Sequence, residues 1–341
     1  MCHCAASFDP SDVGRAVEMA ELVCPSCGAD LDERAQSIRC TGCRRSFPIV
    51  AGIADLRLAP DRYLSFHDDR RKAERLESVV GSAMDVVDAY WSMTPEVPRG
   101  LAATYRRSAS RSVERGSAVV HRFGRRPIGS TLLDVGCGTG GLAVAAAQRG
   151  FTTTGIDVAL RWLVICRRLA ADHGVDVRFI AADGAISPFR REAFTVVTCI
   201  ETIEHAADPR GTLNGSLALA QHAYLAVVAN RFSLVPDPTL GLAFAGYLPR
   251  RYAPTYVGAR RGTRSAFYAP PSLMELATWL GPDAPERGRR PMITSSPLPP
   301  VGSDASIARR TAAQLHDRIV GSGAEPLVRM VTPMLSVAWQ S

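Results

Sequence analysis

Short apolar runs alternate with segments of helix-forming composition between residues 131 and 230. The predicted strands are Thr131–Val135, Thr152–Asp157, the unit Val177–Gly184, Phe194–Ile200 and Ala223–Asn230. Leu142–Arg149 and Pro209–Gln221 have the composition of helices between them. Strands that alternate with helices imply a parallel, doubly wound sheet with its site at the carboxyl ends of the strands. We therefore predict an α/β, Rossmann-like fold.

The pattern becomes less regular after residue 230. Arg231–Pro271 interrupts the alternation as an insertion, and a helix is expected from Pro270 to Leu280. The Pro- and Arg-rich stretch Pro282–Pro300 predicts an extended loop, and Ser306–Ile319 has helical character. Met334–Trp339 predicts a final strand, inserted antiparallel.

Residues 59–126 read as a helical linker region. The mixed-charge run Asp68–Arg75 indicates a solvated helix face. Between Arg99 and Arg126 eight arginines accompany one glutamate, Glu114. This segment is either a helix with a solvated basic face or a flap over an anionic ligand.

Composition and charge exclude some classes of protein. Hydrophobic residues make up 46% of the 341 and charged residues 21%, which fits a globular chain and not a disordered one. Apolar runs such as Leu142–Ala147 are too short to cross a bilayer, and the first residues lack the pattern of a signal peptide, so we expect a cytoplasmic protein. Residues 1–100 carry 12 basic and 16 acidic side chains, while residues 101–341 carry 28 and 17. The basic excess of the second part is a weak hint of nucleic-acid binding.

Four of the nine cysteines have the spacing of a metal site: Cys24, Cys27, Cys40 and Cys43. Two C-x-x-C pairs separated by 12 residues let four thiolates reach one ion. Structural zinc is the leading interpretation, with iron as the alternative metal, and reduced thiols or two disulfides as the alternatives without one. Cys2, His3 and Cys4 are weaker candidates for additional ligands, whereas Cys137, Cys166, Cys199 and Trp162 are expected in or near the core.

The sequence around the four cysteines resembles the Trm112-like zinc ribbons. Leu22–Gly28 and Arg39–Cys43 match the two cysteine knuckles, and Ser46–Ile53 matches the ending of that family. The resemblance implies a small domain that accompanies methyltransferases, as a partner or in the same chain. The expected organisation is a ribbon with its tail at residues 1–58, the linker at 59–126, and a large domain at 127–341 with the insertion at about 231–271.

Glycines follow the first predicted strand, and acids follow the next two. Gly136, Gly138 and Gly140 form a turn that lets the backbone approach a ligand closely. Asp157 ends the second strand, where an acid can accept both hydroxyls of a ribose. Asp183 follows the third strand. The glycines alone leave nicotinamide and adenosylmethionine binding open.

Residues 132–140, read together with Asp157 and Asp183, clearly resemble the class I S-adenosylmethionine-dependent methyltransferases. The resemblance implies S-adenosylmethionine as methyl donor. The residues expected to bind it are Asp134, Gly136, Gly138, Gly140, Asp157, Asp183, Gly184 and Glu201.

The segment Glu201-Thr202-Ile203-Glu204-His205 holds the candidate catalytic residues. If it turns helically, Glu201, Glu204 and His205 share one face. This resembles the E-x-x-E-H of metal-assisted O-methyltransferases, which implies Mg²⁺ or Mn²⁺ at the active site. The alternatives are that His205 acts as a general base without a metal, or that the segment only shapes the substrate wall.

The insertion is the candidate substrate cap, with a basic loop packed on its aromatic residues as the alternative. It carries Arg250, Arg251, Arg260, Arg261 and Arg264, and the aromatic residues Phe244, Tyr247, Tyr252, Tyr256, Phe267 and Tyr268. We expect methylation at O or N of a small, anionic or lipid-/sugar-linked biosynthetic acceptor. The alternatives are a ribosomal or transfer RNA methyltransferase and a non-catalytic donor-binding activator of a partner. The oligomeric state stays open.

Overall fold

One mixed sheet organises the described part of the chain. The computed structural model describes residues 21–34, 36–95, 97–124, 129–234, 242, 245–261, 268–281, 291–296, 314, 318 and 329–340. The strands are β1 (Leu31–Arg34), β2 (Ser37–Cys40), β3 (Ser46–Val50), β4 (Ile53–Asp55), β5 (Thr131–Val135), β6 (Thr152–Asp157), β7 (Arg178–Ala181), β8 (Phe194–Ile200), β9 (Ala220–Ala229), β10 (Met292–Ser295) and β11 (Met334–Gln340). Their order is β1-β2-β3-β4-β7-β6-β5-β8-β9-β11-β10.

The predicted doubly wound sheet is confirmed. The strands β7, β6, β5, β8 and β9 pair in parallel, and β11 inserts antiparallel beside β9 as expected. Parallel strands end at the same edge of a sheet, so the residues after β5, β6, β7, β8 and β9 gather there. This edge is the one that the functional residues share.

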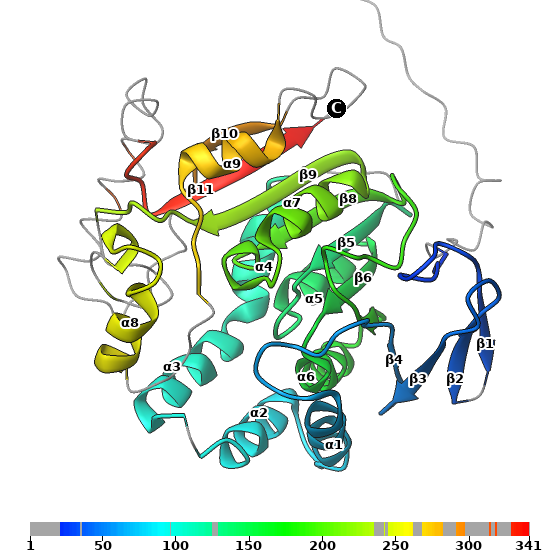
Figure 1. The fold of residues 1–341 in the computed structure, drawn as a ribbon. Helices are drawn as coiled ribbons and strands as arrows, with labels where there is room; N and C mark the ends of the chain where they lie inside the picture. The colour runs from blue at the N-terminus through cyan, green and yellow to red at the C-terminus, as the bar shows by residue number, and fades with distance from the viewer. Residues whose placement is uncertain are drawn as a thin grey trace, which may run out of the picture.

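Helices cover both faces of the sheet. They are α1 (Phe66–Glu77), α2 (Ala83–Ser92), α3 (Arg99–Ser110), α4 (Ser112–His121), α5 (Gly141–Gln148), α6 (Leu160–Asp172), α7 (Pro209–Ala218), α8 (Ala253–Arg261) and α9 (Leu273–Leu280), with short 3-10 turns η2 (Ile203–His205) and η3 (Ala245–Tyr247). Alternate residues of β5 face opposite cores: Leu133 packs in the core under α7 and α9, and Leu132 in the core under α4 and α5. Figure 1 shows α3 and α8 beyond the arrowhead of β9, at the carboxyl edge.

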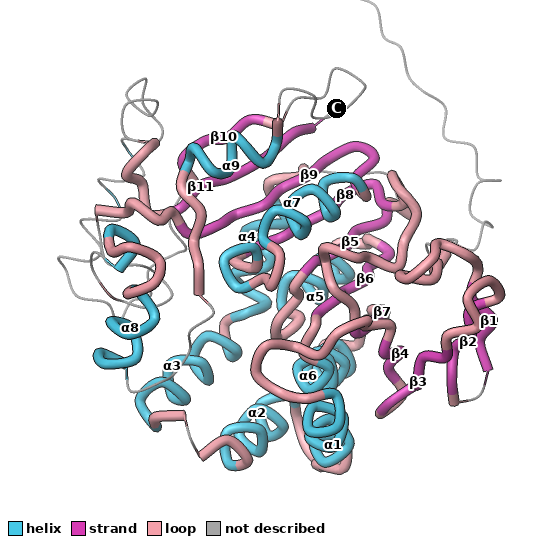
Figure 2. Tube along the Cα trace, in the orientation of Figure 1, coloured by secondary structure: helices cyan, strands magenta, loops and turns pink. Residues whose placement is uncertain are grey.

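The cysteine-bearing segment continues into the large sheet. Its strands β1 to β4 pair antiparallel in sequence, and β4 then pairs in parallel with β7. Figure 2 shows these strands as an extension of the sheet beyond β7. The boundary predicted at residue 58 therefore falls just after a strand that the two parts share.

Two predictions about local structure were wrong. Met292–Ser295 lies inside the stretch expected to be a loop, yet it forms β10, because its backbone pairs with the open edge of β11. Asp69 lies in the run expected to be a solvated helix face, yet only 1% of it is exposed. The other parts of Pro282–Pro300 and, apart from residues 314 and 318, the helix expected at Ser306–Ile319 lie outside the described residues, as do Cys2, His3 and Cys4.

The predicted core cysteines are buried. Cys137, Cys166 and Cys199 are at most 8% exposed. Trp162 is partly buried on α6, with its ring 4.6 Å from that of Tyr90 on α2. No helix among the described residues is both long and apolar enough to cross a membrane.

Candidate functional site

The glycine turn connects the end of β5 to α5. The backbone N–H groups of Gly136 and Cys137 both donate to the carbonyl oxygen of Ile156, at 2.8 and 3.0 Å, which ties the turn to the neighbouring strand β6. Gly136 has a φ of +70°, and a Cβ atom there would lie 2.2 Å from Thr202. At Gly138, also left-handed, a Cβ would meet nothing within 4 Å. The backbone is therefore tightly packed at Gly136, whereas the space beside Gly138 is empty and a ligand can approach there.

Asp157 joins the glycine turn to the end of β6. Its carboxylate accepts the N–H of Gly138 at 2.9 Å and that of Ala159 at 2.8 Å. Burial raises the pKa of this carboxyl group above its usual value, and the two N–H donors oppose that rise. A carboxylate offers about four acceptor positions, so two remain for further hydroxyl donors such as those of a ribose.

Asp183 lies at the same edge, after β7. The N–H of Ala182 donates to the backbone carbonyl of Asp157 at 3.0 Å, which brings the two acid-bearing loops together. The Asp183 carboxylate accepts the N–H of Ala185 at 2.9 Å and is half-buried. A Cβ at Gly184 would lie 2.7 Å from Val135, so the loop packs closely on the end of β5.

Asp134 lies beneath the turn and not on its surface. It is 3% exposed and accepts the hydroxyl of Thr198 on β8 at 2.9 Å. Burial raises the pKa of this carboxyl group to about 7. Its geometry supports the turn from below, and a direct contact with a ligand stays a prediction.

The helical turn that would place Glu201, Glu204 and His205 on one face does not include Glu201. Glu201 has a φ of +53°, and its N–H donates to Val227 on β9 at 2.7 Å, so the chain stays bound to the sheet. Only residues 203–205 turn, as η2. Sequence reasoning missed Thr202, whose hydroxyl lies 3.0–3.3 Å from the carbonyls of Val135, Gly136 and Ile200.

Glu204 forms part of the wall under the site. It is completely buried, and its Oε1 accepts the N–H of Ala229 at 3.2 Å. Among the described residues, four thiols are the one group of three or more ligand atoms placed closely enough for a metal. The carboxylates of Glu201 and Glu204 with His205 do not form such a group, so they do not fit an active-site cation.

His205 is neutral in the folded chain at neutral pH. Burial lowers the pKa of its imidazole to about 4, since the charged form is poorly solvated there. Its ring lies 5.1 Å from the ring of Tyr268, at the end of the insertion. A neutral imidazole can accept a proton, and a pKa this low makes His205 a weaker base than an exposed histidine.

Acid should therefore destabilise the fold through His205. The unfolded chain takes up a proton near pH 6.5 and the folded chain near pH 4, so this residue's stabilising contribution is complete above pH 6.5 and is lost as the pH falls toward 4. Between pH 6.5 and 4, the free energy of unfolding in urea should fall more steeply for wild type than for His205→Gln. The difference should be up to about 1.4 kcal/mol per pH unit. The control His67→Gln, at a side chain 79% exposed, should follow wild type. Parallel curves for wild type and His205→Gln would contradict the assignment.

The two ends of the predicted insertion meet at the site. The N–H of Arg231 donates to Pro271 at 3.0 Å, and the N–H of Ala269 donates to the backbone of Glu204 at 2.8 Å. Arg250 pairs with Glu275 on α9 at 2.6 Å. Arg251 and Arg260 stack over Tyr252 and Tyr256. Of the predicted cap residues, Phe244, Arg264 and Phe267 lie outside the described residues, as does the side chain of Arg261.

The four cysteines converge as predicted. All four sulfur atoms lie within 4.8 Å of one another, and the Cys24–Cys43 and Cys27–Cys40 sulfurs are 3.7 and 3.4 Å apart. These separations are too long for disulfide bonds, at about 2.05 Å, and close to the roughly 3.8 Å that two thiolates on one tetrahedral zinc ion would have. The Cys43 N–H also donates to Cys40 Sγ at 3.3 Å. The donor set fits a structural zinc ion.

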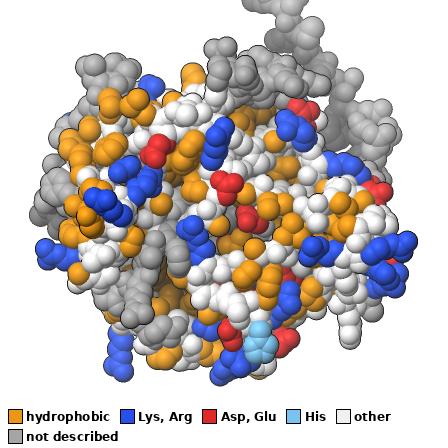
Figure 3. Space-filling model, in the orientation of Figure 1, with side chains coloured by type: hydrophobic (Ala, Val, Ile, Leu, Met, Phe, Trp, Pro, Cys, Tyr) orange, Lys and Arg blue, Asp and Glu red, His pale blue; other side chains and the backbone are white. Residues whose placement is uncertain are grey.

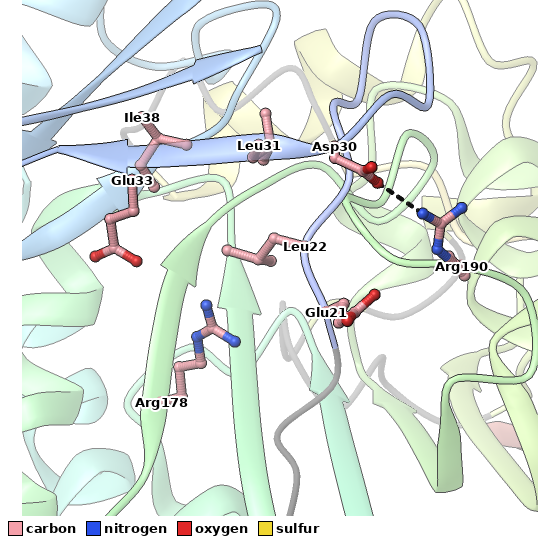
Figure 4. A pocket seen from close by; sticks show the side chains of 8 residues that line it. All are labelled: Glu21, Leu22, Asp30, Leu31, Glu33, Ile38, Arg178 and Arg190. Carbon is pink, nitrogen blue, oxygen red and sulfur yellow. Dashed lines mark hydrogen bonds and ion pairs between the residues drawn. The ribbon is translucent and has the colours of Figure 1, made fainter. Parts of the chain in front are cut away.

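A separate hollow lies at the opposite edge of the sheet. Its volume is about 420 Å³, and Figure 4 shows it between the strand β1 and the amino end of β7, with Arg178 on one side and Glu33 on the other. Asp30 and Arg190 close one end with an ion pair of 2.8 Å. None of the glycine turn or its acids lines it, so it is distinct from the candidate donor site.

Comparisons with known proteins match the part of the chain that holds this site. Residues 132–241 match a family model described as a methyltransferase domain. The chain is 44% identical over 87 residues to a ubiquinone biosynthesis O-methyltransferase of Pseudomonas entomophila, covering 25% of this chain and 37% of that protein. It is 39% identical over 95 residues to the protein of that name from Pseudomonas fluorescens Pf0-1, covering 27% and 40%. The chain thus spans about two fifths of the relatives' length.

One of the solved structures that this chain matches is a methyltransferase complex. It is the complex of Haemonchus contortus phosphoethanolamine N-methyltransferase 2 with S-adenosyl-L-methionine. The match has a TM-score of 0.43 and 18% identity, and it covers 67% of this chain and 52% of that one.

Proposed function

We propose that this chain, which contains a class I S-adenosylmethionine-dependent methyltransferase domain, transfers the methyl group of that donor to a small-molecule or lipid-/sugar-linked acceptor. An oxygen is the preferred target atom, because the relatives that the chain matches are named O-methyltransferases. One observation carries the proposal: the Asp157 carboxylate accepts the Gly138 N–H at the carboxyl edge of the sheet.

The donor fits the chemistry of this edge. Asp157 would accept ribose hydroxyls, Asp183 lies beside it for the adenine, and the open backbone at Gly138 would face the amino-acid part. A sulfonium is already a good leaving group. The chain's main task is therefore to hold nucleophile and methyl carbon close together and in line.

The acceptor would lie between η2 and the end of the insertion. His205 and Tyr268 face each other there, and a neutral His205 would accept the proton that the acceptor hydroxyl releases. The arginines that stack on Tyr252 and Tyr256 favour an anionic acceptor. On the face in Figure 3, basic side chains are interspersed with apolar and acidic ones, which gives little support to a nucleic-acid substrate.

Methyl transfer should not require an added divalent cation. Glu204 is completely buried, and among the described residues its carboxylate is not grouped with other ligand atoms closely enough to hold one. Adding millimolar Mg²⁺ or Mn²⁺ to protein with its cysteine site intact should leave the initial rate within about twofold, since in this proposal His205 and not a metal ion assists the loss of the acceptor's proton. A rate that rises severalfold with Mg²⁺, and loses that response in Glu204→Gln, would contradict this prediction.

Labelled donor distinguishes the candidate acceptors. Purified protein is incubated with methyl-labelled S-adenosylmethionine and either a small-molecule extract, a lipid extract or stripped RNA. We expect label in a small-molecule or lipid fraction. Label confined to RNA would replace the proposed acceptor class, and donor binding without turnover in any fraction would indicate a non-catalytic activator.

We further propose that Cys24, Cys27, Cys40 and Cys43 hold a structural zinc ion in a ribbon of the Trm112-like kind. The support is the convergence of four thiols and the fit of their spacing to tetrahedral zinc. When bound, zinc would supply folding free energy to a segment too short to bury a large core. None of the seven described cysteines forms a disulfide bond, which fits a cytoplasmic location.

A further inference from the structure

Several buried charges lie behind the loop that carries Asp157. Three carboxylates, Asp55, Asp61 and Asp69, face three guanidinium groups, Arg57, Arg70 and Arg161. Apart from Arg70, whose side chain is 32% exposed, each of these side chains is at most 5% exposed. Those from Asp55 to Arg70 come from residues outside the matched methyltransferase region, from the end of β4 to the first turns of α1. Burying this many charges costs desolvation free energy, which ion pairs and hydrogen bonds of good geometry must offset.

Asp69 caps a helix that has no cap of its own. The helix α6 begins after Ala159, whose side chain offers no acceptor. Asp69, on the neighbouring helix α1, accepts the N–H groups of Leu160 at 3.1 Å and Arg161 at 3.4 Å. Figure 1 shows α1 beside α6. A carboxylate at this place satisfies N–H groups that the first helical turn leaves open and faces the positive end of the helix dipole.

Arg57 holds the same loop from its carbonyl side. Its Nη1 donates to the carbonyl of Val158 at 2.5 Å and to Asp69 at 2.6 Å. The rest of its guanidinium forms a two-pronged pair with Asp55, at 2.7 and 2.9 Å, on the last residue of β4. Arg161 binds Asp69 at 2.7 Å and also pairs with Asp61. The backbone that follows Asp157 is therefore held on two sides: Asp69 accepts its N–H groups, and Arg57 donates to its carbonyl oxygen.

We propose that Asp69, together with Arg57, is a positioning residue of donor binding: it fixes the loop 158–160 so that Asp157 presents its carboxylate to the donor's ribose. This inference rests on the proposed function. Asp157 itself accepts the N–H of Ala159, inside the loop that Asp69 and Arg57 hold. Loss of the outer contacts lets this loop shift, and the carboxylate shifts with it. The segment that follows the cysteine-bearing strands thus contributes to the affinity for the donor without touching it.

The test compares two Asp→Asn substitutions that each break an Asp–Arg pair. Asp69→Asn removes the two buried pairs with Arg57 and Arg161 behind the loop. Asp88→Asn removes an exposed pair with Arg106, 2.6 Å long, on the surface of α2 and α3. Binding of S-adenosylhomocysteine is measured by calorimetry. We expect Asp69→Asn to weaken it roughly tenfold, or about 1.4 kcal/mol, with kcat at saturating donor within about twofold and the donor KM raised to match. Asp88→Asn should bind as wild type.

A second comparison separates positioning from general destabilisation. In an Asp157→Asn background, adding Asp69→Asn should weaken binding of S-adenosylhomocysteine by less than about twofold, because the group that Asp69 positions is already lost. The proposal would be overturned if Asp69→Asn lowered the affinity for S-adenosylhomocysteine equally in the wild-type and Asp157→Asn backgrounds. It would also be overturned if Asp69→Asn and Asp88→Asn bound S-adenosylhomocysteine with the same affinity. If Asp69→Asn does not fold, Arg57→Lys serves instead: lysine keeps the charge but cannot reach Asp55, Asp69 and Val158 together, and binding should fall about threefold.

Failure of the inference and failure of the proposed function give different results. Wild-type protein that does not bind S-adenosylhomocysteine contradicts the function. Wild-type binding that Asp69→Asn leaves unchanged contradicts only the positioning role.

Discussion

Gly136→Ala should weaken binding of S-adenosylmethionine by at least about 100-fold, or about 2.8 kcal/mol. The residue combines a φ of +70° with no room for a side chain, since a Cβ would lie 2.2 Å from Thr202. Thr202 cannot move away cheaply, because its hydroxyl is bonded to the carbonyls at the ends of β5 and β8. The turn must therefore shift, and with it the Gly138 N–H that Asp157 accepts. Calorimetric titration with S-adenosylhomocysteine measures the loss.

Gly174→Ala is the matched control for this substitution. Gly174 also has a left-handed backbone, with a φ of +63°, but a Cβ there would meet nothing within 4 Å. Alanine should cost about 1–2 kcal/mol of folding free energy through backbone strain alone, and donor affinity should not change. If the two variants bound the donor equally, the close packing of Gly136 would not matter for the site.

Cys27→Ser should remove the metal and lower the melting temperature by more than about 10 °C, because structural zinc supplies several kcal/mol to a small domain. Cys27 is exposed, so the thiol itself contributes little packing, and a large loss of stability would point to a ligand. The loss should extend to the large domain, since β4 pairs with β7 and ends at Asp55. Zinc content by mass spectrometry and thermal unfolding measure the two effects.

Ser26→Ala is the control at the neighbouring exposed position. It should keep one zinc ion per chain and the wild-type melting temperature. Two results together would contradict a structural metal: wild-type protein purified from zinc-supplemented cells contains no zinc, and its melting temperature equals that of Cys27→Ser.

Sequence predicted the central strands well, because their signal is local. The bounds of Thr131–Val135, Thr152–Asp157 and Phe194–Ile200 agree with the structure, since each is a short run rich in apolar or β-branched residues and ended by a glycine or an acid. Met292–Ser295 has no such signal of its own and becomes a strand only through the edge of β11. Local patterns cannot report a pairing that depends on a distant partner.

The candidate site likewise has residues that local sequence patterns predict and residues that only the fold brings together. Its glycines and acids stand next to predicted strands, and so their positions could be inferred. Asp69 could not be inferred, because a charged residue in a charged run is typical of a solvated face, and its partners at Arg57 and Arg161 are brought to it only by the fold. The helical arrangement of Glu201 with His205 failed because the sheet holds Glu201 in a left-handed conformation.

The decisive test of the proposed donor is titration of the purified wild-type chain with S-adenosylhomocysteine and, separately, with NAD. We expect one molecule of S-adenosylhomocysteine bound per chain, with binding lost in Gly136→Ala and kept in Gly174→Ala, and no comparable binding of NAD. Tighter binding of NAD, or no binding of S-adenosylhomocysteine by folded protein, would contradict it.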